Sequence, residues 1–210
     1  MASVIEEPGL RERKRLATRR AIQLAVLELV DERGLDVTVE EISRRADVSP
    51  RTFFNYFPSK EAALLGDAAP LPSGEARARF VNAGLDEPLF DGLAAMLAET
   101  ADVTSSDADV VRLRRGVLKS HPHLAARRMA HTRAFEEGLC EIVLERMLAD
   151  EPALAEQQEL ARRRAWLVTL TGFGVMRHAW MSWADGTRSK SLREYVTDSF
   201  AEAKALLRQN

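Results

Sequence analysis

Two side chains that can read nucleic-acid bases stand four residues apart in the stretch SPRTFFNYFPSK, residues 49–60. They are Arg51 and Asn55, and on a helix this spacing puts both on one face. A guanidinium can form two hydrogen bonds to guanine, and a carboxamide can form two to adenine. Groups that can bind phosphate lie beside them, at Thr52, Tyr56 and Lys60. These residue types are typical of a surface that contacts nucleic acid.

A basic segment, LRERKRLATRR, lies nearer the start of the chain. Its single acid is Glu12, and its cations are Arg11, Arg13, Lys14, Arg15, Arg19 and Arg20. The whole chain has a formal net charge of −2, so this positive charge is local and indicates a segment that binds phosphate. The alternative is an ordinary solvated start of a helix.

Helical periodicity dominates the sequence. Apolar residues recur at spacings of three and four, and runs typical of strands are nearly absent, so we expect an all-α chain. The first helix should cover residues 11–33, with a buried stripe at Ile22, Ala25, Val26, Leu29 and Val30. Gly34 should then supply a left-handed stop.

Cap residues delimit three shorter helices after Gly34. Thr38 and Glu41 have the spacing of a capping box. Ser49 followed by Pro50 should start the next helix, which Pro58 should end. Ser59 can then cap a fourth helix over residues 60–65.

Two short helices joined by a tight turn are the pattern of a helix-turn-helix, whose second helix enters the DNA major groove. Apolar residues from both helices and the turn can pin this unit together: Ile42, Ala46, Val48, Phe53 and Phe57. Arg51 and Asn55 then remain on the outward side. The alternative is a small helical core filled with aromatic residues.

The stretch TRRAIQLAVLELVDERGLDVTVEEISRRADVSPRTFFNYFPSKEAAL resembles the DNA-binding domain of TetR-family transcriptional regulators. The positions that fit the family pattern are Arg19, Ile22, Ala25, Leu29, Gly34, Thr38, Ile42, Ala46, Val48, Ser49, Thr52, Phe57, Lys60, Glu61 and Leu64. Asp47 departs from it, because the family usually has glycine in this turn. Phe54 also departs, because the family usually has a tyrosine there that contacts phosphate, and Tyr56 can take over part of that contact.

The resemblance implies which residues contact double-stranded DNA: Arg11, Arg13, Lys14, Arg15, Arg19, Thr38, Ser49, Pro50, Arg51, Thr52, Asn55, Tyr56 and Lys60. The stretch SPRTFFNYFPSKEAALLGD also resembles a mainly actinobacterial subgroup that includes mycofactocin-type regulators. That likeness implies an acyl-thioester or other lipophilic effector.

The segment GDAAPLPSGEA, residues 66–76, is rich in Gly, Pro and small residues and marks a domain junction. We expect an N-terminal helix-turn-helix domain with its basic arm over residues 1–66. Residues 67–210 should form a larger helical domain for ligand binding and dimerisation, as the resemblance implies. Further helices are expected over residues 88–100, 107–119, 123–148, 153–184 and 192–207, about nine in the whole chain.

The last two predicted helices suggest a homodimer. The segment AWLVTLTGFGVMRHAWMSW is apolar nearly all round, which indicates burial on two sides. The expected interface residues are Gly172, Gly174, Trp180, Leu192, Val196, Phe200 and Ala203. The alternative is a helix central to a monomeric core.

An apolar effector pocket could be lined by Met96, Met129, Phe135, Leu139, Val143, Trp166, Leu170 and Phe173. At helical spacing these residue types also serve as plain core. A group of arginines could clamp an anionic effector, or could simply form a solvated face: Arg114, Arg115, Arg127, Arg128 and Arg133.

Several classes of protein are not expected. Cys140 is the single cysteine, so no internal disulfide can form, and a reducing cytoplasm fits best. No run approaches the length of a membrane span. His121, His123 and His131 lack the paired short spacing of zinc ligands, so neither a metal nor another cofactor is expected.

The sequence therefore favours a homodimeric regulator, a repressor, that binds an inverted-repeat operator. A lipophilic effector would release it by shifting the helix over residues 60–65 and so changing the spacing of the two recognition helices. Two alternatives stay open: a helical adaptor that binds only protein, and an enzyme that uses a histidine or carboxylate base. No catalytic motif supports the enzyme.

Overall fold

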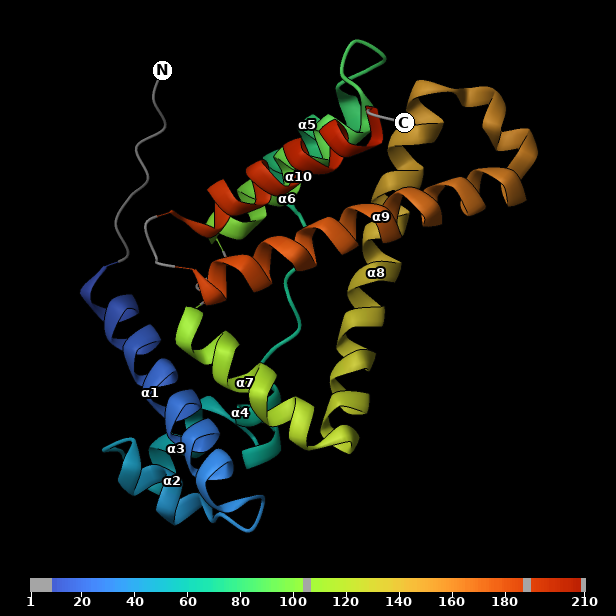
Figure 1. Cartoon of the computed structure of the whole chain (residues 1–210). Coiled ribbons are helices and arrows are strands. Elements are labelled where there is room, and N and C mark those ends of the chain that lie inside the picture. Colours follow the sequence, from blue (N-terminus) through green and yellow to red (C-terminus); the bar gives the residue numbers. More distant parts are fainter. Residues whose placement is uncertain (1–8, 104–106, 187–189, 209–210) are drawn as a thin grey trace. The chain divides into compact units, whose positions relative to one another are not determined.

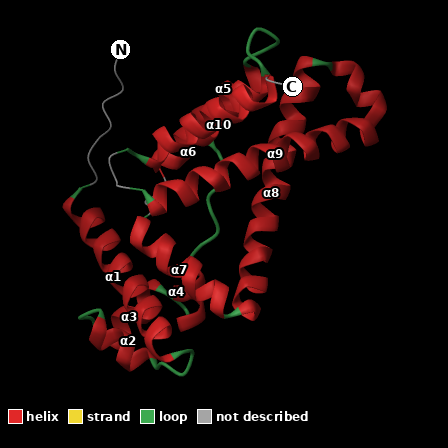
Figure 2. Cartoon of the chain, viewed as in Figure 1, coloured by secondary structure: helices red, strands yellow, loops and turns green. Residues whose placement is uncertain are grey.

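The computed structural model describes residues 9–103, 107–186 and 190–208, and within them the chain is helical and contains no strand (Figure 2). The all-α prediction is confirmed. These residues form ten α-helices and one 3₁₀ helix, labelled as in Figure 1. Their bounds are α1 Leu10–Arg33, α2 Val39–Arg45, α3 Pro50–Tyr56, α4 Lys60–Leu65, α5 Gly74–Asn82, α6 Leu89–Val103, α7 Ala108–Ser120, α8 Pro122–Asp150, η1 Pro152–Gln157, α9 Gln158–Asp185 and α10 Leu192–Arg208.

Contacts divide the chain into two compact units. The first contains Met1–Asp67 and Ser105–Ala125, and the second contains Ala68–Thr104 and Ala126–Asn210. The division expected from the sequence was one cut after residue 66, which assigns α7 to the second domain. In the structure α7 packs along α1 and belongs to the first unit.

The first unit is built around α1. All five residues of its predicted apolar stripe are buried. Phe53 and Phe57 join this core from α3, and each contributes roughly 1.5–3 kcal/mol by burial. Helix α7 and the start of α8 complete the core with Val110, Val117 and Leu124.

The predicted cap residues of the helices in the first unit are confirmed. Gly34 ends α1 with φ of 80°. Thr38 and Glu41 form both hydrogen bonds of a capping box. The hydroxyls of Ser49 and Ser59 accept from the third residue of α3 and of α4, so each helix has a fixed first turn.

The second unit has its own core. Helices α9 and α10 pack along each other, and α10 also packs along α6. Buried residues from α6, α8, α9 and α10 meet here, including Leu93, Leu139, Ala165 and Phe200.

One helix of the second unit was missed. Helix α5 begins at the end of the segment interpreted as a domain junction, residues 66–76, and no helix was expected between that segment and residue 88. Phe80 is its one buried residue, so its apolar pattern is too short to show periodicity.

Within the described residues, no helix is both long enough and apolar enough to pass through a bilayer.

Candidate nucleic-acid interface and effector cavity

The turn between α2 and α3 is held by backbone hydrogen bonds. Ala46 N–H donates to the carbonyl of Ile42 at 2.9 Å, and Val48 N–H donates to that of Ser43 at 2.9 Å. Asp47 occupies the left-handed region with φ of 53°. Aspartate visits that region more readily than most residues, so it can replace the glycine usual in this turn.

Helix α3 has a buried face and an outer face. Phe53 and Phe57 are buried, with ring centroids 6.2 Å apart. The exposed residues of α3 are Pro50, Arg51, Phe54 and Asn55, while Thr52 and Tyr56 are half-buried. Arg51 and Asn55 are therefore available to a groove, as residues that read bases must be.

Two hydroxyls of the predicted interface act as helix caps. Ser49 Oγ accepts from the N–H of Thr52 at 3.0 Å and lies 2.8 Å from Thr52 Oγ1. Thr38 caps α2, and its backbone N–H donates to Glu41 at 2.9 Å. This backbone hydrogen bond, with a further one from the Thr38 hydroxyl, lowers the pKa of Glu41. The side chains of Thr38 and Ser49 are exposed, but each already caps a helix.

Lys60, which was predicted to anchor phosphate, has hydrogen-bond partners within the fold. Its Nζ donates to the carbonyls of Leu35 at 2.7 Å and of Val37 at 3.1 Å, and the side chain is half-buried. The ammonium therefore ties the loop between α1 and α2 to the start of α4. Its position in a family pattern gave no sign of this, because carbonyl partners leave no trace in a sequence.

Arg19, another predicted phosphate contact, also has a structural role. Its guanidinium lies over the ring of Phe57, 4.3 Å from the centroid, and its side chain is 20% exposed. It donates to the carbonyl of Tyr56 and to the carboxylate of Asp67. Arg19 thus holds α1 against the end of α3.

The other cations of the basic segment are exposed. Arg11, Arg13 and Lys14 are exposed on the first turns of α1. Arg15 is exposed but donates to Glu12 at 2.7 Å, which raises the pKa of Arg15 and lowers that of Glu12.

Arg20 links α1 to the start of α7. It donates to Asp107, whose other carboxylate oxygen accepts from the N–H groups of Asp109 and Val110 at 3.0 and 3.1 Å. Burial raises the pKa of Asp107, but the bonds from Arg20 and Val110 outweigh it, so this pKa lies below its ordinary value.

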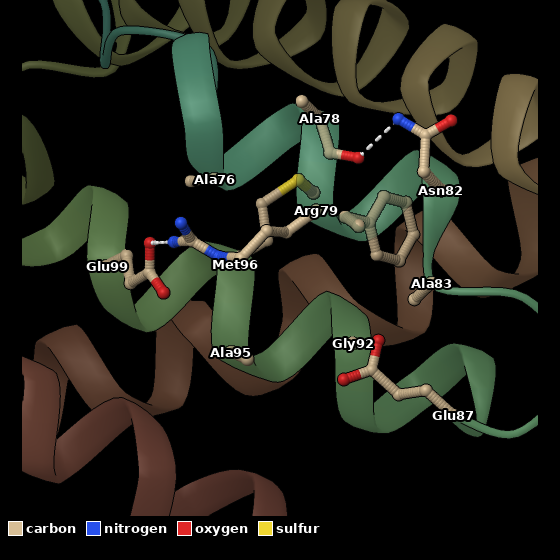
Figure 3. Close-up of a pocket in the computed structure, with 11 residues that line it drawn as sticks. Ala76, Ala78, Arg79, Asn82, Ala83, Glu87, Gly92, Ala95, Met96 and Glu99 are labelled. Atoms are coloured by element: carbon tan, nitrogen blue, oxygen red, sulfur yellow. Dashed lines mark hydrogen bonds and ion pairs between the residues drawn. The ribbon is translucent and has the colours of Figure 1, made fainter.

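A cavity of about 580 Å³ lies between α5 and α6 in the second unit (Figure 3). Its lining is Ala76, Ala78, Arg79, Phe80, Asn82, Ala83, Glu87, Gly92, Ala95, Met96 and Glu99. Arg79 and Glu99 are paired at one end, and Glu87 lies beside Gly92 at the other. Small and apolar side chains form most of the remaining wall.

Of the predicted pocket residues, Met96 lines this cavity. Met129 and Leu170 are instead exposed, at 70% and 50%. The others pack in or against the core of the second unit, away from the cavity: Phe135, Leu139, Val143, Trp166 and Phe173. Periodicity marks a buried face, but it does not tell a filled face from a hollow one.

None of the arginines predicted as an anion clamp lines the cavity. Arg114 instead donates from Nε to the carbonyl of Leu64 at 2.8 Å, at the end of α4. The buried cation beside the cavity is Arg146, which sequence reasoning missed. Its guanidinium donates to the carbonyls of Phe80, Gly84 and Glu87 and so fixes the corner between α5 and α6.

Four residues expected in a dimer interface belong to the core of the second unit: Gly172, Leu192, Val196 and Phe200. A Cβ at Gly172 would lie 2.6 Å from Cδ2 of Leu93, so the close approach it permits is to α6 of the same chain. Trp180 and Ala203 are half-buried, and Gly174 is exposed.

Helix α9 nevertheless has an apolar outer stripe. Leu167 is 68% exposed, and Leu170 and Met181 follow on the same side at 50% and 42%. Gly174 lies between them at helical spacing, with open space where its side chain would be. Of the residues expected in a dimer interface, Gly174 lies on this stripe, whereas Gly172 faces the core.

Within the described residues, no three His, Cys, Asp or Glu side chains gather in a way that could hold a metal ion. His121 and His123 have ring centroids 6.1 Å apart. Cys140 is buried, and burial raises the pKa of its thiol above the ordinary value.

Residues 24–65 match the model of the family described as bacterial regulatory proteins, tetR family. The chain is 46% identical over 59 residues to the HTH-type transcriptional regulator TcmR of Streptomyces glaucescens. That match covers 28% of this chain and 26% of TcmR, so it spans about a quarter of the relative's length.

Two solved structures are similar to larger parts of the chain. FadR of Thermus thermophilus, described as a TetR family transcriptional repressor in complex with lauroyl-CoA, is 24% identical, with 87% of this chain and 91% of FadR covered and a TM-score of 0.44. A TetR family transcription regulator from Marinobacter aquaeolei VT8 is 19% identical, with 76% and 98% covered and a TM-score of 0.31.

Proposed function

We propose that this chain, whose residues 24–65 form a tetR-family domain, is a DNA-binding transcriptional regulator that works as a homodimer and responds to an effector. The observation that carries the proposal is the outer face of α3. It presents Arg51 and Asn55 to solvent on a helix whose first turn is capped and whose opposite face is buried.

DNA binding is supported by two surfaces of the first unit. Arg51 and Asn55 have the donors and acceptors that discriminate guanine and adenine in the major groove. Arg11 and Lys14 add exposed positive charge, which binds phosphate independently of sequence. Arg15 can join them only by giving up part of its pairing with Glu12.

A homodimer is supported by the outer stripe of α9. Leu167, Leu170 and Met181 leave apolar side chains exposed along one line of the helix. A second copy that covers this line would bury them, and Gly174 would let the partner helix approach closely. Two recognition helices related by twofold symmetry would then read an inverted repeat.

The α5–α6 cavity is the proposed effector site. Met96, Phe80 and the neighbouring alanines suit a small, largely apolar molecule. Arg79 is neutralised by Glu99 and by Glu75 at 3.7 Å, and Glu87, itself 3.7 Å from Arg146, adds an acceptor. We therefore propose an effector with an apolar body and a hydrogen-bond donor. Release from the operator on effector binding makes the chain a repressor in this proposal.

The signal is proposed to reach α3 through α4. In the first unit α4 is bound at its end by Arg114 of α7 and at its start by the α1–α2 loop through Lys60. The chain leaves the first unit directly after α4, at Asp67, and re-enters it directly before α7, at Ser105. A change in the second unit can thus act on α4 from both sides.

The test starts with selection of a binding sequence from random duplex DNA. Fluorescence anisotropy then measures the affinity of wild type, Arg51→Ala and Asn55→Ala for the selected and random duplexes across a salt series. Each variant should lose about 1–3 kcal/mol of binding to the selected duplex and little on random DNA. Arg164→Ala, an exposed arginine of α9, is the matched control and should bind like wild type.

A regulator is excluded if wild-type protein enriches no sequence and both variants bind like wild type. That outcome would favour the adaptor, which needs neither side chain. Circular dichroism of each variant shows whether a lower affinity reflects an unfolded protein.

A further inference from the structure

Phe54 leaves an aromatic ring in solvent at the centre of the outer face of α3. Its side chain is 56% exposed, whereas Phe53 and Phe57 of the same segment are 0% and 2% exposed. The ring of Phe53 supports it from one side, with centroids 5.4 Å apart and planes at 87°. Phe54 is therefore held in place without being part of the core.

The surroundings of Phe54 are the residues proposed to read DNA. Arg51 lies one turn earlier on the helix and Asn55 follows directly, and both are exposed. Residues three and four apart on a helix are neighbours on one face. Phe54 shares a face with Arg51 at this spacing, so a groove that receives Arg51 also lies against the ring of Phe54.

The chemistry of the ring limits what it can contact. A phenyl group has no polar hydrogen, so Phe54 cannot donate to a phosphate oxygen. In the major groove the apolar group on a base edge is the 5-methyl of thymine, and apolar side chains read it by contact. Such contact would also remove the exposed ring from water.

We infer that Phe54 is a specificity-determining residue that selects thymine in each half-site through its 5-methyl group. The inference rests on the proposed DNA-binding function and adds a base and an atom to it. Thymine occupies a position next to the one read by Arg51.

The experiment replaces thymines of the selected duplex by deoxyuridine, one position at a time. This change removes the methyl and leaves base pairing intact. Each half-site should contain one thymine whose single replacement weakens binding of wild-type protein by about fourfold. This is the factor for one methyl group removed from an apolar environment. Phe54→Ala should bind the thymine duplex more weakly and show no further weakening at that position.

Two variants guard the interpretation. Phe54→Leu keeps an apolar side chain and should retain part of the discrimination between thymine and uracil. Leu85→Ala removes another exposed apolar side chain, 81% exposed and in the second unit, and should bind like wild type.

The inference is overturned if wild type and Phe54→Ala show the same uracil profile while both still prefer the selected duplex. In that case the DNA-binding function stands and the ring packs elsewhere, for instance on deoxyribose, which a uniform weakening on selected and random duplexes would reveal. If wild type selects no sequence, the function and the inference fail together.

Discussion

Arg146 donates from Nε to Oδ2 of Asp150, one turn further along α8, at 2.6 Å. The guanidinium is completely buried, and its other bonds go to backbone carbonyls of the α5–α6 corner, including that of Glu87 at 2.9 Å. A charge in this setting is tolerated because each nitrogen has a partner. One side chain of α8 therefore fixes a wall of the proposed effector cavity.

Replacing Arg146 by Ala should destabilise the protein by about 3–5 kcal/mol, because it strands the carboxylate of Asp150 and three carbonyls. Chemical denaturation monitored by circular dichroism measures this. Arg77→Ala breaks a surface pair with Glu145 in which both side chains are 48% exposed, so it should cost less than about 1 kcal/mol. Equal effects of the two variants would contradict the role of Arg146.

Lys60→Ala should weaken the fold rather than the salt dependence of DNA binding. Removing two hydrogen bonds to carbonyls should cost about 1–3 kcal/mol of stability. The slope of log affinity against log salt should stay unchanged. Lys14→Ala, which removes an exposed cation from each subunit of the dimer, should instead reduce that slope by about 1.8, twice the value for one phosphate that is no longer neutralised. A reduced slope in Lys60→Ala would restore the phosphate role predicted from the sequence.

Asp107→Asn should lower stability at neutral pH by up to about 1 kcal/mol, since asparagine can still cap α7 but cannot pair with Arg20. The pKa of Asp107 is lower in the fold than in the unfolded chain. Its charge therefore stabilises the fold above the ordinary aspartate pKa, and this contribution disappears as pH falls through the lowered folded value. Urea unfolding at several pH values should show the two proteins converging in acid, and a constant difference would refute the assignment.

Leu167→Lys combined with Leu170→Lys should make the protein monomeric, because two charges would enter the apolar stripe of α9. Sedimentation velocity measures the change. The same variant should keep its helical content, since both positions are exposed. Gly172→Ala should lower stability, because its Cβ would collide with Leu93. It should not directly oppose self-association.

The local chemistry of the first unit was readable from the sequence because caps and turns are short-range. Thr38 with Glu41, Ser49 with Pro50 and the left-handed turn all depend on neighbours within a few residues. The partners of Lys60 and Arg19 could not be read, since they are carbonyls and a ring distant in sequence.

The second unit was harder to anticipate for the same reason. Its pattern shows which residues avoid water, but a cavity depends on side chains from different helices failing to meet. Met96 and Leu139 are both buried in the core of the second unit, yet of the two only Met96 lines the cavity. Helix α5 was also missed, because residues that disfavour helices, Gly, Pro and Ser, are frequent just before it and at its first position.

The place of α7 in the first unit has a consequence for synthesis of the chain. Val110, Val117 and Leu124 complete a core whose other buried members all precede residue 66. During translation helices α1 to α4 emerge first, but they cannot finish packing until the ribosome has also released α7. The chain between α4 and α7 is therefore synthesised while the core of the first unit is still incomplete. A fragment truncated before α7 would display apolar surface that the full chain covers.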